Sequence, residues 1–222
     1  MENKAIIFDM DGLLIDSEPI WKEAGVELFT RLGYPMTKEK MSETMGMRCD
    51  EVVAMRYKER PWTELTLEKT MKELISLVVR KTKEHGKAMP GAIRAVQTAQ
   101  NSVWKTAISS SSPMELIEAV LELLGVGGFD ILHSAFSEKN GKPAPDVYFS
   151  TAKLLGVKPE NCLAIEDSFN GVRSAKSAGM KCISVPDLRY TTKIDMQKIG
   201  ADYILDSLEN VSEELLTTIF NS

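Results

Sequence analysis

The sequence has few cysteines, no long apolar run and no excess of positive charge. Its three cysteines lack CxxC spacing, and Cys162 and Cys182 lie in apolar segments, so all three are expected to be reduced core residues. No apolar stretch approaches the roughly eighteen residues of a membrane span, and the N-terminal segment lacks the long apolar region of a signal peptide. A net charge of −5 argues against nucleic acid, because phosphate binding needs a basic face. These absences predict a cytoplasmic protein without membrane or nucleic-acid partners.

The composition that is present is ordinary for a globular protein. The 222 residues are 43% hydrophobic and 27% charged, which allows one large domain or one domain carrying a smaller insertion. The sequence contains no internal repeat and no low-complexity tract.

Short apolar runs alternate with helical patterns after residue 88. This alternation predicts βαβ units and a parallel sheet covered by helices on both faces. A further buried strand is expected alone near the N-terminus. The expected strands lie within residues 4–11, 103–109, 129–136, 162–166, 181–186 and 202–205.

Residues 15–88 have a different pattern, with apolar side chains at the three- and four-residue spacing of helices. An all-helical segment inserted after the first strand would lie over the carboxyl ends of the strands, where open α/β sheets bind ligands. The predicted organisation is therefore an α/β core of residues 1–14 and 89–222 and a helical cap of residues 15–88 that acts as a lid. Pro90-Gly91 marks a turn at the return crossing.

Acidic residues gather where the first strand ends, in "DMDGLLIDSE". Asp9 and Asp11 are two positions apart in an extended segment, so their side chains point the same way, and Gly12 permits the turn that follows. The alternative interpretation is that they are turn-forming acids that only solubilise a strand end.

Four serines end a second strand in "AISSSSPMEL". Pro113 is a good first helical residue, and Ser112 with Glu115 has the spacing of a capping box. Backbone amides at such a helix start, together with the hydroxyls of Ser110 and Ser111, would make an anion site. The capping box alone would explain Ser112 but not its two neighbours.

Lys142 and a second pair of acids complete the set. Lys142 lies between Gly141 and Pro143 in a loop, where a lone lysine is usually solvated, and Glu166 with Asp167 follows another apolar strand. Polar clusters at the ends of several strands of one parallel sheet would converge on one edge of that sheet. This convergence is difficult to explain by structure alone.

The converging groups suit phosphoryl transfer. Carboxylates favour Mg²⁺, whereas a lysine and helix amides favour a phosphoryl group. Asp9 would attack as the nucleophile and form an aspartyl-phosphate, and Asp11 would protonate the leaving alcohol and later take a proton from water. The metal would be the counter-charge of the acids.

Four stretches of the chain, "DMDGLLIDSE", "SSSS" after "AI", "GKPAPDVY" and "IEDSFNGVRSAKSAGM", resemble the ordered motifs of the haloacid dehalogenase superfamily of phosphohydrolases. The resemblance implies a Rossmann-like parallel sheet core with an inserted all-helical cap domain. It makes Asp9 the nucleophile, Asp11 the acid/base and Lys142 the cation of the third motif. It also makes Ser110 a phosphate ligand. Glu166 and Asp167 would hold magnesium together with Asp9 and the backbone carbonyl of Asp11.

Within that superfamily the chain is similar to the β-phosphoglucomutase-like group, and most similar to phosphatases of 2-deoxyglucose 6-phosphate and hexitol phosphates. The expected substrate is a small phosphorylated metabolite, with sugar, polyol, nucleotide and small-acid phosphates left open. Arg48 resembles a substrate-binding arginine in the mutase cap, although a solvated or ion-paired surface arginine is equally compatible. Trp21 stands where the mutase has a histidine, which favours hydrolysis over the alternative, a β-phosphoglucomutase.

An alternative from another class is a non-catalytic regulator that binds a phosphosugar. Every catalytic position is filled, which argues against it, and Asp9→Asn would abolish turnover in an enzyme while leaving the affinity of a binder nearly unchanged. A purely structural protein would gain nothing from acids gathered around a lysine. A monomer is the expected oligomeric state.

Overall fold

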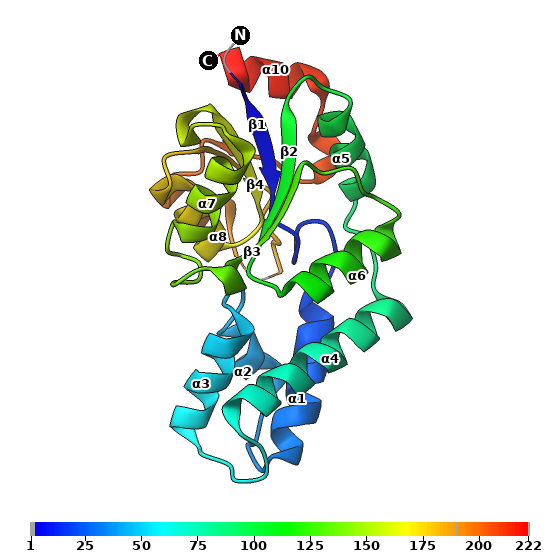
Figure 1. Cartoon of the computed structure of the whole chain (residues 1–222), viewed down its shortest axis with the longest axis vertical. Helices are drawn as coiled ribbons and strands as arrows, with labels where there is room; N and C mark the ends of the chain where they lie inside the picture. The colour runs from blue at the N-terminus through cyan, green and yellow to red at the C-terminus, as the bar shows by residue number, and fades with distance from the viewer. Residues whose placement is uncertain (1–2, 190, 222) are drawn as a thin grey trace.

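The computed structural model describes residues 3–189 and 191–221, and in this part of the chain six strands form one parallel sheet (Figure 1). The order of the strands is β3-β2-β1-β4-β5-β6, so the N-terminal strand lies in the middle of the sheet. This arrangement confirms the predicted α/β class. The strands are β1 (Ala5–Phe8), β2 (Lys105–Ser110), β3 (Ile131–Ser134), β4 (Cys162–Glu166), β5 (Lys181–Ser184) and β6 (Tyr203–Ile204).

Helices cover both faces of the sheet, because alternate side chains of each strand point to opposite faces. In β1, Ile6 and Phe8 pack into one apolar cluster, whereas Ala5 and Ile7 pack into the other. The first cluster includes residues of α5 (Ala92–Gln100), α6 (Met114–Leu124) and α10 (Glu213–Asn221), and the second includes residues of α7 (Asp146–Leu155), α8 (Phe169–Ser177) and α9 (Lys193–Lys198). Cys49, Cys162 and Cys182 are buried and free, as expected.

Between β1 and α5 the chain is helical. These helices lie beyond the carboxyl end of β1, at the end of the molecule opposite both termini (Figure 1). The two connecting segments pair with each other: the amide of Asp16 donates to the carbonyl of Lys87 (2.9 Å), and that of Met89 donates to the carbonyl of Leu14 (3.0 Å). The helices of this insertion are α1 (Glu18–Arg31), α2 (Lys38–Ser42), α3 (Cys49–Glu59) and α4 (Leu67–His85).

The insertion has an apolar interior of its own that is continuous with the main core. Trp62 is buried, its ring packs against Phe29 and Tyr57, and its Nε1 donates to Thr70 Oγ1 (3.1 Å). Trp62 therefore belongs to the core of the insertion. Among the described residues, no helix is both long enough and apolar enough to cross a bilayer.

Candidate active site

The parallel sheet brings the predicted polar residues to one edge. Asp9 follows β1, and its amide continues the ladder by donating to the carbonyl of Ile165 on β4 (3.0 Å). Glu166 ends β4, so it lies beside Asp9, and Asp167 follows it. The geometry therefore agrees with the expectation that polar residues at the ends of separate strands would converge.

Lys142 reaches this edge from the loop before α7 and bridges two carboxylates. Its Nζ donates to Asp9 Oδ1 and to Glu166 Oε1, both at 2.6 Å, and to the carbonyl of Ser109 at 3.1 Å. The side chain of Lys142 is 2% exposed, so it is not the solvated surface lysine that its loop position alone would suggest. Burial lowers the pKa of Lys142, but the carboxylates of Asp9 and Glu166 outweigh it and raise the pKa above its usual value.

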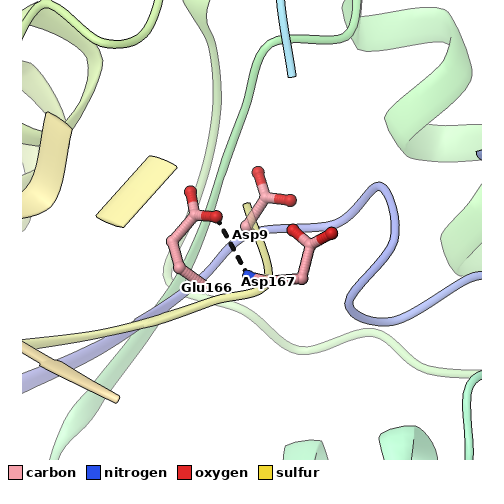
Figure 2. Close-up of side chains that lie close together, drawn as sticks. All are labelled: Asp9, Glu166 and Asp167. Atoms are coloured by element: carbon pink, nitrogen blue, oxygen red, sulfur yellow. Dashed lines mark hydrogen bonds between the residues drawn. The ribbon is translucent and has the colours of Figure 1, made fainter. Parts of the chain in front are cut away.

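Glu166 is held by donors on both of its oxygens. Oε1 also accepts from the hydroxyl of Tyr148 (2.7 Å), and Oε2 accepts from the amide of Asp167 (3.2 Å), the bond drawn in Figure 2. Gly171 lies against this carboxyl group, and a Cβ there would come within 2.0 Å of its oxygens. The sequence did not single out Tyr148, since a tyrosine on an amphipathic helix gives no local signal of such a partner.

Asp167 is a buried carboxylate with a free oxygen. Its Oδ1 has no hydrogen-bond partner, and Gly12 is next to its other oxygen, since a Cβ on Gly12 would lie 2.2 Å from Asp167 Oδ2. Asp9, Glu166 and Asp167 each place one oxygen within 4.8 Å of the others (Figure 2). A buried, unpartnered oxygen in such a cluster fits a bound cation, and carboxylate oxygens are the donors that Mg²⁺ prefers.

The charges in this cluster repel one another. Burial first, and then the neighbouring carboxylates, raise the pKa values of Asp9 and Asp167 well above the usual range. Lys142 opposes this effect on both residues but does not cancel it. The protein therefore concentrates more negative charge at this point than one ammonium group offsets.

The side chain of Asp11 is turned away from the other acids and toward the helical insertion. Its Oδ1 accepts from Nε1 of Trp21 on α1 (3.0 Å), and its Oδ2 accepts from the hydroxyls of Ser112 (2.7 Å) and Ser110 (3.3 Å). Among the described residues, the acid cluster contains Asp9, Glu166 and Asp167 but not the carboxylate of Asp11. This separation is compatible with the expectation that Asp11 reaches a metal only through its backbone.

The predicted capping box is wrong. α6 begins at Met114 with Pro113 as its N-cap, and no side chain caps it. The hydroxyl of Ser112 is instead drawn to Asp11, and the Ser112 amide donates to Ser110 Oγ (3.0 Å). Ser111 donates to the carbonyl of Gly46 in the insertion (3.0 Å). The serines thus connect the acid/base candidate, the start of α6 and the insertion.

Arg48 connects the insertion to the core. Its guanidinium donates to both carboxylate oxygens of Asp50 (3.0 and 2.8 Å) and to the carbonyls of Ala135 (2.9 Å) and Glu138 (2.8 Å). These bonds place Arg48 at the contact between the insertion and the core. Its role in binding substrate or phosphate stays a prediction.

Two adjoining cavities open at this edge. A smaller one is lined by Asp9, Asp167 and Lys142, and a larger one lies between the core and the insertion. Asp11 and Glu18 line both.

Glu18 is a further buried acid that the sequence did not single out. Burial raises the pKa of Glu18 to about 7, although Lys22, one turn further along α1, lowers it in part. The two side chains form an ion pair at 3.6 Å. Both belong to the lining of the larger cavity.

Comparisons with known proteins agree with this geometry. The sequence model of the haloacid dehalogenase-like hydrolases matches residues 3–179. Hexitol phosphatase B of Escherichia coli (strain K12) is 35% identical over 215 residues, which cover 96% of each chain. The phosphorylated carbohydrates phosphatase of Thermotoga maritima is 33% identical over 181 residues, which cover 81% of this chain and 83% of the relative. A crystal structure of mutant CbbY from Rhodobacter sphaeroides, in complex with xylulose-(1,5)bisphosphate, superposes with a TM-score of 0.84 at 27% identity and covers 94% of this chain and 96% of CbbY.

Proposed function

Because the chain belongs to the haloacid dehalogenase-like hydrolase family, we propose that it is a magnesium-dependent phosphatase of sugar or sugar-alcohol monophosphates that works through an aspartyl-phosphate. The observation that carries this proposal is the position of Asp11 at the junction of the two cavities, with Asp9 in the smaller one. Asp9 lies with Lys142 in the smaller cavity, whereas Asp11 also lines the larger one, on the side of the leaving group. Phosphate would occupy the first cavity and the alcohol the second.

In the first half-reaction, a carboxylate oxygen of Asp9 attacks phosphorus. A bond forms between that oxygen and phosphorus, the ester bond breaks, and Asp11 gives its proton to the departing alkoxide. In the second half-reaction Asp11 takes a proton from a water molecule that attacks the same phosphorus. The products are inorganic phosphate and the free Asp9 carboxylate.

The hydrogen bonds of Asp11 suit a group that changes its protonation state. Ser110 and Ser112 hydroxyls can rotate to donate or to accept, while the indole of Trp21 can only donate. Together these three donors fix the direction of the carboxylate toward the larger cavity. The bond from Trp21 also ties the acid/base to α1, so that closure of the insertion and proton transfer are linked.

Asp9 and Asp167 are the proposed carboxylate ligands of magnesium, which would neutralise phosphate oxygens when it is bound. Glu166 lies in the same cluster and is a further proposed ligand, and its Oε1 also holds Lys142. Lys142 in turn orients Asp9 and offers positive charge to the transferred phosphoryl group. We also propose that residues 15–88 act as a cap that moves about the paired segments at Ile15 and Ala88.

Phosphate release tests the proposal. Purified protein is incubated with Mg²⁺ and a panel of hexose, hexitol, pentose and nucleoside monophosphates, with Asp9→Asn and a metal-chelated sample as controls. We expect release from hexose or hexitol phosphates that is lost in both controls. Binding without release would instead indicate a regulator. Conversion of β-glucose 1-phosphate to glucose 6-phosphate, after addition of a bisphosphate primer, would indicate a mutase.

A further inference from the structure

We propose that Glu18 and Lys22 form a binding site for the hydroxyl groups of the leaving alcohol, and that this buried pair makes an uncharged polyol the preferred partner of the phosphate. The inference rests on the proposed phosphatase function and names the part of the substrate that the insertion recognises. It assigns substrate selectivity to two residues of α1.

The geometry places Glu18 and Lys22 in the part of the cavity where the leaving alcohol would lie. Glu18 and Lys22 are one helical turn apart, and their side chains are only 13% and 9% exposed. Glu18 lines the smaller cavity as well as the larger one, so it lies close to where the ester oxygen would leave. Lys22 lines only the larger cavity of these two. A chain of hydroxyls that starts at the ester oxygen would therefore meet Glu18 first.

Most of the remaining lining of the larger cavity is apolar, so Glu18 and Lys22 are a charged pair in apolar surroundings. The larger cavity is walled on the insertion side by Met41, Met45, Met47, Cys49, Val52 and Leu74. Burying an ion pair in such surroundings carries a desolvation penalty that its mutual attraction does not reliably offset. At 3.6 Å the two charges are also further apart than in a close ion pair. Stability alone is therefore a poor reason to place these charges here, and recognition of a polar ligand in the cavity is a better one.

The balance of charge selects the class of ligand. Lys22 is the only basic residue among the described residues that line the larger cavity, whereas Glu18 and Asp11 are both acidic. A second phosphate would need positive charge in excess and would be repelled by the Glu18 carboxylate. A hydroxyl group can donate to Glu18 and accept from Lys22, so a polyol satisfies both without adding charge. Its C–H groups would contact the methionines.

Selectivity ratios test this inference. Values of kcat/KM are measured with Mg²⁺ for glucitol 6-phosphate, for 4-nitrophenyl phosphate, which has no aliphatic hydroxyls, and for glucose 1,6-bisphosphate. The proteins are the wild type, Glu18→Gln, Lys22→Met and the control Glu68→Gln. Glu68 forms an ion pair with Lys72 at the same helical spacing, but on the exposed surface of α4. Circular dichroism confirms that each variant is folded.

We expect Lys22→Met to lower the preference for glucitol 6-phosphate over 4-nitrophenyl phosphate by about tenfold or more, as for hydrogen bonds to a charged group. Glu18→Gln removes the carboxylate that is paired with Lys22 in the cavity, so the preference for glucose 1,6-bisphosphate over glucitol 6-phosphate should rise about tenfold. Glu68→Gln should change neither ratio.

Equal losses on all three substrates in both variants would mean that the pair is structural, and would overturn the inference while leaving the phosphatase function intact. Unchanged ratios would overturn it in the same way. No phosphate release by the wild type from any of the three substrates would overturn the proposed function, and this inference with it.

Discussion

Lys142→Met should strongly destabilise the protein, because the Lys142 ammonium is the cation closest to two buried carboxylates. Its Nζ lies 2.6 Å from both Asp9 Oδ1 and Glu166 Oε1, and the two acidic side chains are only 7% and 0% exposed. Methionine fills a similar volume, so the substitution removes charge with little change in packing. Removing one partner of a buried ion pair typically lowers the free energy of unfolding by about 3–5 kcal/mol, because the other charge is left uncompensated. For a chain of this length that corresponds to a melting temperature lower by about 6–20 °C.

The effect should depend on pH in a defined direction. The pKa of Asp9 is already raised by burial and by Glu166, and the loss of Lys142 raises it further. An acid whose pKa is higher in the folded than in the unfolded state binds its proton more tightly when folded, so stability falls as the pH rises through that interval. The difference between wild type and variant should therefore be larger at pH 8 than at pH 5.

Urea denaturation followed by circular dichroism, with a chelator present, measures this difference. Lys72→Met is a matched control, since Lys72 lies at the same 2.6 Å from Glu68, but the two side chains are 68% and 70% exposed. Its unfolding curve should nearly coincide with that of the wild type. If the two variants lost the same stability, or if the loss at Lys142 did not grow with pH, the electrostatic account of this site would be refuted.

Three further predictions concern the surroundings of the site. As the pH rises from about 4.5 to 7, the free energy of unfolding of the wild type should fall by up to about 3 kcal/mol more than that of Glu18→Gln, because the folded protein raises the pKa of Glu18 to about 7. If this were wrong, urea titrations at several pH values would show the same pH dependence of stability for both proteins. Arg48→Met removes hydrogen-bond donors to carbonyls of the core loop after β3, so steady-state kinetics should show KM raised about tenfold with a smaller change in kcat. A change in kcat alone would contradict the role of Arg48 in holding the insertion against the core. Gly171→Ala places a Cβ within 2.0 Å of the carboxyl group of Glu166, so it should lower both the free energy of unfolding, by about 1–3 kcal/mol, and the activity. Thermal denaturation and phosphate release measure the two effects, and a stable, active variant would mean that Glu166 moves freely.

The features of the fold that are encoded locally were predictable from the sequence. Alternating apolar runs and helical patterns predicted a parallel sheet, and the helical spacing of residues 15–88 agrees with α1 to α4. The central place of β1 and the order of the strands were not predicted, because pairing between β1 and β4 joins segments more than 150 residues apart. Local pattern carries no information on which strand will be the neighbour of another.

In the site, too, the features that depend on local sequence were predictable, whereas the contacts between distant segments were not. Asp9, Lys142, Glu166 and Asp167 come together because each follows a strand or precedes a helix at the same edge of the sheet. The capping box of Ser112 failed because Asp11, 101 residues earlier, is a better partner for the hydroxyl than the helix amides.

The contacts of Arg48 were not predictable for a related reason, since its carbonyl partners lie 87 and 90 residues away. Local sequence cannot show which distant acceptor a side chain will reach. Short motifs therefore predicted which residues occupy the edge of the sheet, but not which hydrogen bonds they make there.

The accumulation of acids at this edge of the sheet has a physical explanation. Asp9, Glu166 and Asp167 are buried together with one ammonium group, and the pKa values of Asp9 and Asp167 are raised as a result. Protons can relieve this repulsion at low pH, whereas a divalent cation can relieve it at neutral pH. Protons and the cation compete for the same oxygens, so burial of the cluster strengthens its preference for a cation once the carboxylates are ionised. Asp11 bonds to Trp21 and lies outside this cluster, and in the proposed mechanism its carboxylate transfers the proton.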